Sequence, residues 1–514
     1  LEGHSPTWSL VEASRAFPDL IGHLVYGGVT GLGFYALMTI SLRANPELEE
    51  PVRPRPKKVV ILGGGFGGLA AAQRLEQLLS SESDLAVTLV SESNYLLFTP
   101  MLVEVASSGL EAQHISAPVR AACPRTRFRR AQVESIDTMD SMVRVRAGES
   151  SPIEALPYDH LILALGSTPS FHGLPGLEEN AFTLKTLEDA TRLRNHVIAS
   201  LERADIELDR TMRQRLLTFV VAGAGFAGME MIAELFDLAR SIRRYYPGIH
   251  RTELRFVLVH SRERVLPELS VELGEYARRK LEARGIEFVL GKRVAGATAG
   301  AVLLGDGSRI ETSTLVWTAG NQPNPLLKSL HAEMNRAGQV VVDSTLQIGG
   351  LANVWAIGDC AQVPDAYAEG QFCPPTAQHA LREGKVVAEN VLAALHGKPS
   401  IPFRFHTLGT LVALGHRTAA AEIRGHRFSG LLAWLMWRTI YLSKLPGLEK
   451  KVRVAFDWAL DLVFPRDIVL TADAFTPTLA QLSSMKSGDG QMPVATAHST
   501  GGDRVVVARE ELTT

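Results

Sequence analysis

The sequence has few cysteines and almost no net charge. Its three cysteines, Cys123, Cys360 and Cys373, form no CxxC pair and no spacing typical of a metal site. We therefore expect no disulfide scaffold, no dithiol redox motif, no bound metal, and a reducing compartment. The formal net charge is −2, whereas proteins that bind nucleic acid carry a clear basic excess. Nucleic acid is therefore not expected as a partner.

One long hydrophobic run stands near the start of the chain. Residues 20–42, "LIGHLVYGGVTGLGFYALMTISL", are apolar over a length that as a helix crosses a hydrocarbon core of roughly 30 Å. We predict a transmembrane helix, with a buried globular helix as the alternative; a signal peptide is disfavoured because no basic leader or cleavage site is evident. The charged, proline-rich segment 44–58 reads as a linker. Its basic residues place the main body on the cytoplasmic face of the cell membrane.

Two segments share one pattern of strand, glycine turn and helix. They are "VVILGGGFGGLAAAQRLEQLL" at 59–79 and "LTFVVAGAGFAGMEMIAELFDL" at 217–238. In such a turn the first glycine allows the bend, the second lets the backbone approach a pyrophosphate, and the third lets helix and strand pack closely. The glycines in these three positions are Gly63, Gly65 and Gly68 in the first segment and Gly223, Gly225 and Gly228 in the second. Two such units in one chain predict a flavin site and a nicotinamide site.

Three further apolar runs have the form of strands that return to the edge of a nucleotide site. They are "YDHLILALGSTP" at 158–169, "TLVWTAGNQPNP" at 314–325, which contains Gly320, and "NVWAIGDCAQ" at 353–362. The last run contains Gly358 and Asp359. An acid in that position either caps the following helix or bonds the ribityl or phosphate portion of a flavin, and the two glycine turns favour the second interpretation.

Longer motifs extend this pattern. They are "GGGFGG" at 63–68, "NYLLFTPML" at 94–102, the segment 158–195, "GAGFAGME" at 223–230, "VWAIGDCA" at 354–361, "PPTAQHALREGK" at 374–385 and "FPRDIV" at 464–469. With these motifs the chain resembles the two-dinucleotide-binding flavoproteins and, within them, the type II NADH dehydrogenases, which are single-subunit NADH:quinone oxidoreductases. The resemblance runs from about Lys57 to Thr471.

The resemblance implies roles for individual residues. FAD would be held by Gly63, Gly65, Phe66, Gly68, Thr99, Pro100, Gly166, Asp359, Ala377 and Gln378. NADH or NADPH would bind at Gly223, Gly225, Gly228, Glu230, His260 and Gly320. We predict catalytic roles for Glu230, beside the nicotinamide and flavin, and for Gln378, beside the flavin or quinone. The alternatives are that Glu230 merely complements the helix dipole and that Gln378 is a polar cap.

Four features depart from the family pattern. Ser91 stands where the acid on the first ribose is expected, so either the adjacent Glu92 substitutes for it or Ser91 itself bonds the ribose more weakly. Arg382 replaces a second glutamine near the quinone entrance, and the N-terminal hydrophobic helix lies outside the common core. In "VLVHSRERVLPEL" at 257–269, His260 stands where a ribose-binding acid is expected, with Arg262 and Arg264 behind it. Because a carboxylate repels a 2′-phosphate and this histidine does not, we predict relaxed nucleotide choice or NADPH preference.

The region 429–464 contains two helical runs on either side of Pro446 and Gly447. The first, rich in Trp434, Trp437 and Tyr441, is too short to span a bilayer but has the aromatic residues typical of a membrane–water interface. The second mixes basic and apolar residues, as interfacial amphipathic helices do. We expect this region to contact membrane lipid, with a buried helical hairpin as the alternative; the tail after residue 475 reads as flexible.

The predicted fold is α/β. It has two Rossmann-like dinucleotide-binding domains, for FAD and NAD(P)H, with a C-terminal membrane-associating α-helical region and an N-terminal candidate transmembrane helix. The predicted divisions are 1–56, 57–170 with 325–400 (FAD), 171–324 (NAD(P)H), 401–475 and 476–514. The predicted function is electron transfer from NAD(P)H through FAD to a quinone, menaquinone or ubiquinone, without proton pumping. A sulfide:quinone oxidoreductase and a flavin-binding redox sensor are the alternatives, and a homodimer is left open.

Overall fold

The computed structural model describes residues 22–23, 25–37, 56–78 and 85–470. The chain divides into two units, Leu1–Lys57 and Lys58–Thr514. In the first unit, residues 22–23 and 25–37 are helical and exposed. The membrane span predicted at 20–42 lies partly outside the described residues, and among the described ones no helix is long and apolar enough to cross a membrane. The predicted tail, 476–514, lies wholly outside them.

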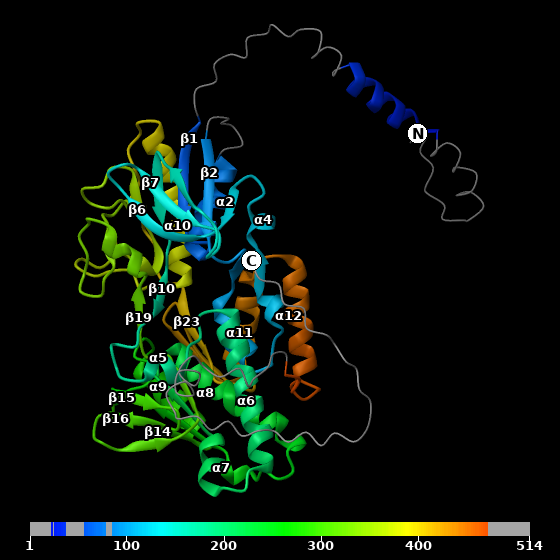
Figure 1. Cartoon of the computed structure of the whole chain (residues 1–514), viewed down its shortest axis with the longest axis vertical. Helices are drawn as coiled ribbons and strands as arrows, with labels where there is room; N and C mark the ends of the chain where they lie inside the picture. Colours follow the sequence, from blue (N-terminus) through cyan, green and yellow to red (C-terminus); the bar gives the residue numbers. More distant parts are fainter. Residues whose placement is uncertain (1–21, 24, 38–55, 79–84, 471–514) are drawn as a thin grey trace, which may run out of the picture. The chain divides into compact units, whose positions relative to one another are not determined.

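The first βαβ pattern forms the centre of a five-stranded sheet (Figure 1). β1 (Lys57–Leu62) leads through the glycine turn into α2 (Phe66–Leu78). The strand order is β21-β9-β1-β2-β5, with β2 at Leu85–Ser91, β5 at Arg127–Arg130, β9 at His160–Leu163 and β21 at Val354–Ala356. The pairs β1 with β9, β2 with β5 and β21 with β9 are all parallel. The carboxyl ends of these strands therefore meet at one edge, where ligands bind in such sheets.

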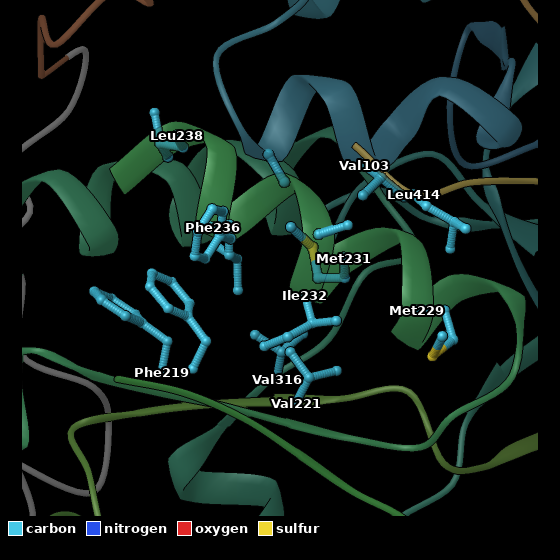
Figure 2. Close-up of a cluster of buried hydrophobic side chains, with 14 of the residues drawn as sticks. Val103, Phe219, Val221, Met229, Met231, Ile232, Phe236, Leu238, Val316 and Leu414 are labelled. Atoms are coloured by element: carbon cyan, nitrogen blue, oxygen red, sulfur yellow. The ribbon is translucent and has the colours of Figure 1, made fainter. Parts of the chain in front are cut away.

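The second βαβ pattern forms another five-stranded sheet, all of it parallel. Its order is β11-β18-β12-β13-β14, with β11 at Ala181–Phe182, β18 at Thr314–Trp317, β12 at Thr218–Ala222, β13 at Arg255–Val259 and β14 at Ile286–Val289. α8 (Phe226–Ile242) follows the second glycine turn and covers one face of this sheet. Figure 2 shows apolar side chains of α8, such as Ile232 and Phe236, above Phe219 and Val221 of β12. Burial of this apolar face holds α8 against the sheet and so sets the orientation of the helix.

Further helices and small sheets belong to the same unit, Lys58–Thr514, as the two parallel sheets. β10 (Ser167–Pro169) pairs antiparallel with β19 (Asn321–Pro323), so the chain leaves and re-enters the first sheet region through adjacent strands. α10 (Ala377–Leu395) packs against α2 (Figure 1). The other helices are α3 (Leu102–Ala106), α4 (Val119–Ala122), α5 (Leu177–Asn180), α6 (Leu187–Ile206), α7 (Arg210–Leu216) and α9 (Val271–Glu282). The antiparallel elements include β6 (Gln132–Asp137), β7 (Met142–Arg146), β8 (Ile153–Pro157), β15 (Val294–Thr298), β16 (Ala301–Leu304) and β17 (Arg309–Glu311).

The C-terminal region is a small sheet followed by two helices. The sheet contains β23 (Gly409–Ala413), β24 (Ala419–Ile423) and β25 (His426–Ser429), and the helices are α11 (Gly430–Lys444) and α12 (Leu448–Asp461). The predicted break at Pro446 and Gly447 is confirmed.

Trp434 and Trp437, which we expected at the membrane–water boundary, face inward instead. Trp434, Trp437 and Trp458 are all buried. The rings of Trp437 and Trp458 lie 6.2 Å apart, because the inner faces of α11 and α12 pack against each other and against the core. These aromatic side chains are therefore part of the hydrophobic core.

Candidate functional site

The first glycine turn has the geometry that a dinucleotide requires. Gly63 has a φ of +108°, and a Cβ at this position would overlap the carbonyl group of Ala164. A Cβ at Gly68 would overlap the carbonyl of Gly63, so this glycine lets α2 pack against the turn. A Cβ at Gly65, in contrast, would meet no atom within 4 Å. The open side of Gly65 is where a pyrophosphate can approach the backbone at the start of α2.

Ser91 and Glu92, at the tip of β2, point to different surroundings. The Ser91 side chain lies against the glycine turn, where a Cβ on Gly64 would sit 2.8 Å from its Oγ. Glu92 is exposed and lines a cavity of about 450 Å³ together with Arg130 and Arg146. Ser91 is therefore the residue placed beside the turn, while Glu92 is free to reach a ligand from the cavity side.

Thr99 and Pro100 begin a single 3-10 turn, Thr99–Met101, after the strand β3 (Tyr95–Leu97). Thr99 is exposed, whereas the preceding Phe98 is buried. Phe98 contacts Phe66 of the glycine turn edge-to-face at 5.9 Å and Tyr441 of α11 at 6.1 Å. The predicted flavin residue Phe66 thus connects through Phe98 to the C-terminal helices.

Gly166 and Asp359 lie at the ends of β9 and β21, which are neighbours in the first sheet. Gly166 has a φ of +65°, and a Cβ there would enter open space. Asp359 accepts a hydrogen bond from Ser167 Oγ at 2.8 Å, and Ser167 Oγ in turn accepts one from Lys185 Nζ at 3.1 Å. Burial lowers the pKa of Lys185, while Asp359 opposes that shift. This chain of contacts was not predicted, because Asp359 is distant in sequence from both Ser167 and Lys185.

Ala377 and Gln378 open α10, whose first turn faces the strand ends. Gln378 Oε1 accepts a hydrogen bond from Leu408 N at 3.3 Å, and Gln378 Nε2 donates to Gly409 O at 3.4 Å. Arg382 donates to Gln378 O at 2.8 Å and lies 4.0 Å over the Phe405 ring. The Gln378 amide therefore joins α10 to the start of β23, a link between the first sheet region and the C-terminal region.

The second glycine turn repeats the geometry of the first. Gly223 has a φ of +111°, and a Cβ at Gly228 would overlap the Gly223 carbonyl. At Gly225 the nearest atom to an added Cβ is Glu268 Oε1, at 3.8 Å, so the backbone is again accessible. Gly320 lies against His172 and Ser170, where a side chain would not fit. Close packing thus explains Gly320, in addition to its predicted place near the nucleotide.

His260 follows β13 directly, at the strand tip where the sequence places it. Its Nδ1 accepts a hydrogen bond from Ala224 N, in the middle of the glycine turn, at 3.2 Å. Its Nε2 is buried and has no partner among the described residues. Burial, followed by the charge of Arg262, lowers the pKa of His260. The neutral ring therefore carries its proton on Nε2.

Glu230 stands in the first turns of α8 and is the catalytic candidate with the most unusual environment. Its Oε1 accepts a hydrogen bond from Ala413 N of β23 at 2.9 Å. Burial raises the pKa of Glu230 to about 8, against the effect of that hydrogen bond, and Glu104 and Glu234 add to the rise. A protonated carboxyl contributes little to a helix dipole. This environment disfavours the interpretation that Glu230 only complements the dipole.

A cluster of buried charged residues lies close to Glu230 in the structure, and the sequence did not lead us to expect it. Glu234, one turn further along α8, accepts a hydrogen bond from Ser107 Oγ at 2.8 Å and pairs with Arg466 at 2.8 Å. Arg466 also pairs with Asp461 at 3.1 Å. Glu104 accepts a hydrogen bond from Trp458 Nε1 at 3.0 Å, and burial raises its pKa. The acids at four-residue spacing in "MEMIAEL" were the available signal, because such spacing places them on one helix face.

Cys360 and Cys373 lack the lowered pKa that a reactive cysteine pair would need. Cys360 and Cys373 are both free thiols. Cys360 is fully buried, and burial raises its pKa to about 11 and that of Cys373 to about 12. A raised pKa keeps a thiol protonated and a poor nucleophile. This geometry disfavours the sulfide-oxidising alternative.

Both glycine turns fit the groups predicted for them. An added Cβ would meet no atom within 4 Å at Gly65 and only Glu268 Oε1, at 3.8 Å, at Gly225, so a pyrophosphate can approach the backbone at both turns. In the first site, Glu383 accepts a hydrogen bond from Gly358 N at 2.7 Å beside Asp359, and burial raises its pKa to about 7. In the second site, the unpartnered Nε2 of His260 is a buried polar atom that a ligand can satisfy.

Comparisons with known proteins agree with this architecture. The family model of pyridine nucleotide-disulphide oxidoreductases matches residues 57–384, and that of the NDH2 C-terminal domain matches residues 407–467. A probable NADH dehydrogenase of Dictyostelium discoideum is 33% identical over 80% of this chain and 91% of its own length. A type II NADH:quinone oxidoreductase of Mycobacterium tuberculosis is 31% identical over 86% of this chain and 98% of its own.

A solved structure supports the same fold. NDH2 from Plasmodium falciparum in complex with NADH superposes with a TM-score of 0.74, at 17% identity, over 81% of this chain and all of its own length. The two family models together cover both glycine turns and the C-terminal helices. The chain therefore belongs to the type II NADH:quinone oxidoreductases, within the pyridine nucleotide-disulphide oxidoreductase family.

Proposed function

We propose that this protein passes two electrons from NADH through FAD to a membrane quinone and pumps no protons. One observation carries the proposal: Glu230 follows the nicotinamide-type glycine turn and bonds β23 of the C-terminal region through Ala413 N. A single carboxyl thus links the nucleotide site with the region from which a quinone would enter. The family's established chemistry fits such a site, because nicotinamide and quinone must both reach one flavin.

The chain's own residues would bind both nucleotides. Gly63, Gly65, Phe66, Gly68, Ser91, Glu92, Thr99, Pro100, Gly166, Asp359, Ala377 and Gln378 would hold FAD, and Gly223, Gly225, Gly228, Glu230, His260 and Gly320 would hold the nicotinamide nucleotide. We assign the FAD domain to residues 57–170 and 325–400 and the nucleotide domain to 171–324, in accord with the two separate parallel sheets. Bound FAD supplies the chemistry of hydride acceptance and electron donation.

Glu230 would hold a proton for the quinone. Reduction of a quinone to a quinol consumes two electrons and two protons. The hydride of NADH carries both electrons and one proton, so the second proton must come from solution. With a pKa of about 8, Glu230 is protonated at neutral pH and can supply it and then regain it. Burial raises the pKa of Tyr441 in α11, and the charge of Glu230 adds to that rise.

The outer faces of α11 and α12 form the proposed contact with membrane lipid. On α12, Leu448, Val452, Phe456 and Leu460 recur every four residues and are 40% to 79% exposed. Four-residue spacing places them on one side of the helix. On α11, Leu431, Leu432 and Leu435 are also exposed. Exposed apolar stripes beside Lys450 and Lys451 fit a helix pair lying in the interface of an anionic membrane.

We further propose attachment at the cytoplasmic face of the cell membrane, with the segment 20–42 as a second attachment. The basic residues that follow this segment support that orientation. The described part of the segment, 22–23 and 25–37, is helical and exposes apolar side chains such as Leu32 and Phe34.

Turnover in vesicles tests the proposed function. Purified protein with FAD is added to liposomes that contain a quinone and a pH-sensitive dye inside. We expect NADH oxidation that depends on quinone, with one quinol formed per NADH and no acidification or alkalinisation of the lumen beyond scalar proton consumption outside. NADH oxidation without quinol formation, or a transmembrane pH gradient, would contradict the proposal.

A further inference from the structure

The tip of β13 carries a hydrogen-bond donor where an acceptor is expected. A carboxylate at this position accepts hydrogen bonds from the two ribose hydroxyls and repels a phosphate on either of them. His260 Nδ1 is already occupied by the amide of Ala224 at 3.2 Å. The ring therefore turns Nε2–H, the donor, away from the glycine turn, and this atom has no partner among the described residues.

The loop that follows His260 is held in place by its backbone. Leu266 N donates to Ala224 O at 2.8 Å, Gly291 N donates to Arg262 O at 3.2 Å, and Lys292 N donates to His260 O at 3.1 Å. The loop is thus fastened to the glycine turn on one side and to the end of β14 on the other. Its side chains are presented from a fixed backbone, as a specificity site requires.

Arg262 is the cation available beside His260. It is exposed, and its side chain forms no ion pair within the described parts of the chain. The other basic groups nearby are engaged: Arg264 donates to Leu269 O, and Lys292 pairs with Asp306 at 2.7 Å. Arg262 can therefore turn toward a bound anion without breaking an existing ion pair, and guanidinium groups suit phosphate oxygens.

Resting on the proposed function, we propose that His260 and Arg262 form a binding site for the 2′-phosphate of NADPH, so that this enzyme oxidises NADPH as well as NADH. His260 Nε2–H donates to a phosphate oxygen and Arg262 provides the charge. The same donor can bond a ribose hydroxyl oxygen, which keeps NADH a substrate. The site selects by removing a repulsion and adding an attraction, and both act only on the phosphorylated nucleotide.

The carboxylates of Glu263 and Glu268 lie nearby and would repel an anion, but neither prevents binding of the 2′-phosphate. Glu268 lies beside Gly225, the glycine that the pyrophosphate approaches, and NADH and NADPH share that pyrophosphate. Glu263 lies against Gly291 and is exposed, so solvent screens its charge. Neither acid replaces the ribose-binding carboxylate that His260 displaces.

The test compares the two nucleotides in three variants. For wild-type holoenzyme we expect kcat/KM for NADPH within about tenfold of that for NADH. The variant His260→Glu places a carboxylate there and should lower the NADPH to NADH ratio of kcat/KM by about 100-fold, because the carboxylate repels the 2′-phosphate. Arg262→Ala should lower that ratio by about tenfold. Arg336→Ala removes an exposed arginine outside the nucleotide domain and should leave the ratio unchanged.

A binding measurement separates this inference from the proposed function. We expect 2′,5′-ADP to bind the wild-type protein at least about tenfold more tightly than 5′-ADP, and this preference to disappear in His260→Glu. A wild-type preference for 5′-ADP, or a preference for 2′,5′-ADP that His260→Glu retains, would overturn the 2′-phosphate site. If neither NADH nor NADPH reduces the flavin, the electron-transfer function fails, while the binding preference still decides the fate of the 2′-phosphate site.

Discussion

Two candidate site residues, Glu230 and His260, have pKa values that their surroundings shift away from the ordinary ones. Glu230 is an acid that keeps its proton at neutral pH, because it is withdrawn from water and lies near Glu104 and Glu234. His260 is a base held neutral by burial and by Arg262. Perturbed groups of this kind are typical of functional sites. In each case a backbone amide, of Ala413 or of Ala224, fixes the orientation of the side chain.

Substitution of Glu230 tests its role as proton donor. Wild-type quinone reduction should decline as the pH rises through about 8, since the Glu230 carboxyl loses its proton there. Glu230→Gln keeps the size of the side chain, and should slow quinone reduction by about 100-fold or more and remove this decline. Stopped-flow rates of flavin reoxidation by quinone between pH 6 and pH 9.5, roughly one to two units around that pKa, provide the measurement. An unchanged pH profile in Glu230→Gln would disprove the assignment.

Glu230 should also make the stability of the protein depend on pH. The pKa of Glu230 is raised in the folded protein, so the folded state holds a proton that the unfolded chain releases above its ordinary pKa near 4.3. The free energy of unfolding should therefore fall as the pH rises from about 4.3 toward the folded value of about 8. Glu230→Gln should be less sensitive to pH over that window, as measured by urea unfolding.

At the scale of single elements, local patterns predicted more than long-range ones. The glycine turns and the strands β1, β9, β12, β18 and β21 were predictable, because a turn, a buried apolar run and a helix start are read within about 20 residues. The inward packing of Trp437 and the link from Lys185 to Asp359 were not. Both depend on which distant segment packs beside which, and composition does not specify that.

The segment after α12 is anchored to the protein interior by the buried side chain of Arg466. Arg466 enters the space between α3 and α8, where it pairs with Glu234 and Asp461 and donates to Ser107 O at 3.1 Å. Arg466→Met would leave two carboxylates without their partner, and should lower the free energy of unfolding by about 3–5 kcal/mol.

The matched control for Arg466 is an exposed ion pair. Arg427 pairs with Glu272 at 3.2 Å, and the two side chains are 50% and 68% exposed. Because water screens such a pair, Arg427→Met should change the free energy of unfolding by less than about 1 kcal/mol. Equal effects of the two substitutions in urea denaturation would show that Arg466 does not anchor the C-terminal region.

If the apolar side of α12 contacts lipid, charged residues placed there should weaken binding of the protein to membranes. The double substitution Val452→Asp with Phe456→Asp places two charges on a face whose side chains are now 61% and 64% exposed. We expect binding to vesicles that contain anionic lipid to fall by about 100-fold or more, since each apolar side chain contributes about 1.5–3 kcal/mol when buried. Met139→Asp, at an 88% exposed position between β6 and β7, is the control. Unchanged co-sedimentation of the α12 variant would contradict the membrane assignment.

At the scale of the whole molecule, the C-terminal region connects the two parallel sheets. Two parallel sheets each present a glycine turn, and the chain crosses between the two regions through the paired strands β10 and β19. The C-terminal region reaches back to both: Gln378 of α10 bonds the 408–409 backbone, and Glu230 of α8 bonds Ala413. This arrangement explains why one polypeptide suffices for nucleotide oxidation and quinone reduction.

Electron transfer from a nicotinamide to a quinone through the flavin of one chain can be followed in an anaerobic titration. Purified, FAD-loaded protein is titrated with NADH and then with a short-chain quinone. We predict that one equivalent of NADH bleaches the flavin absorbance and that one equivalent of quinone restores it. A flavin that NADH does not bleach, or that stays bleached when quinone is added, would contradict the account and leave a flavin-binding sensor as the alternative.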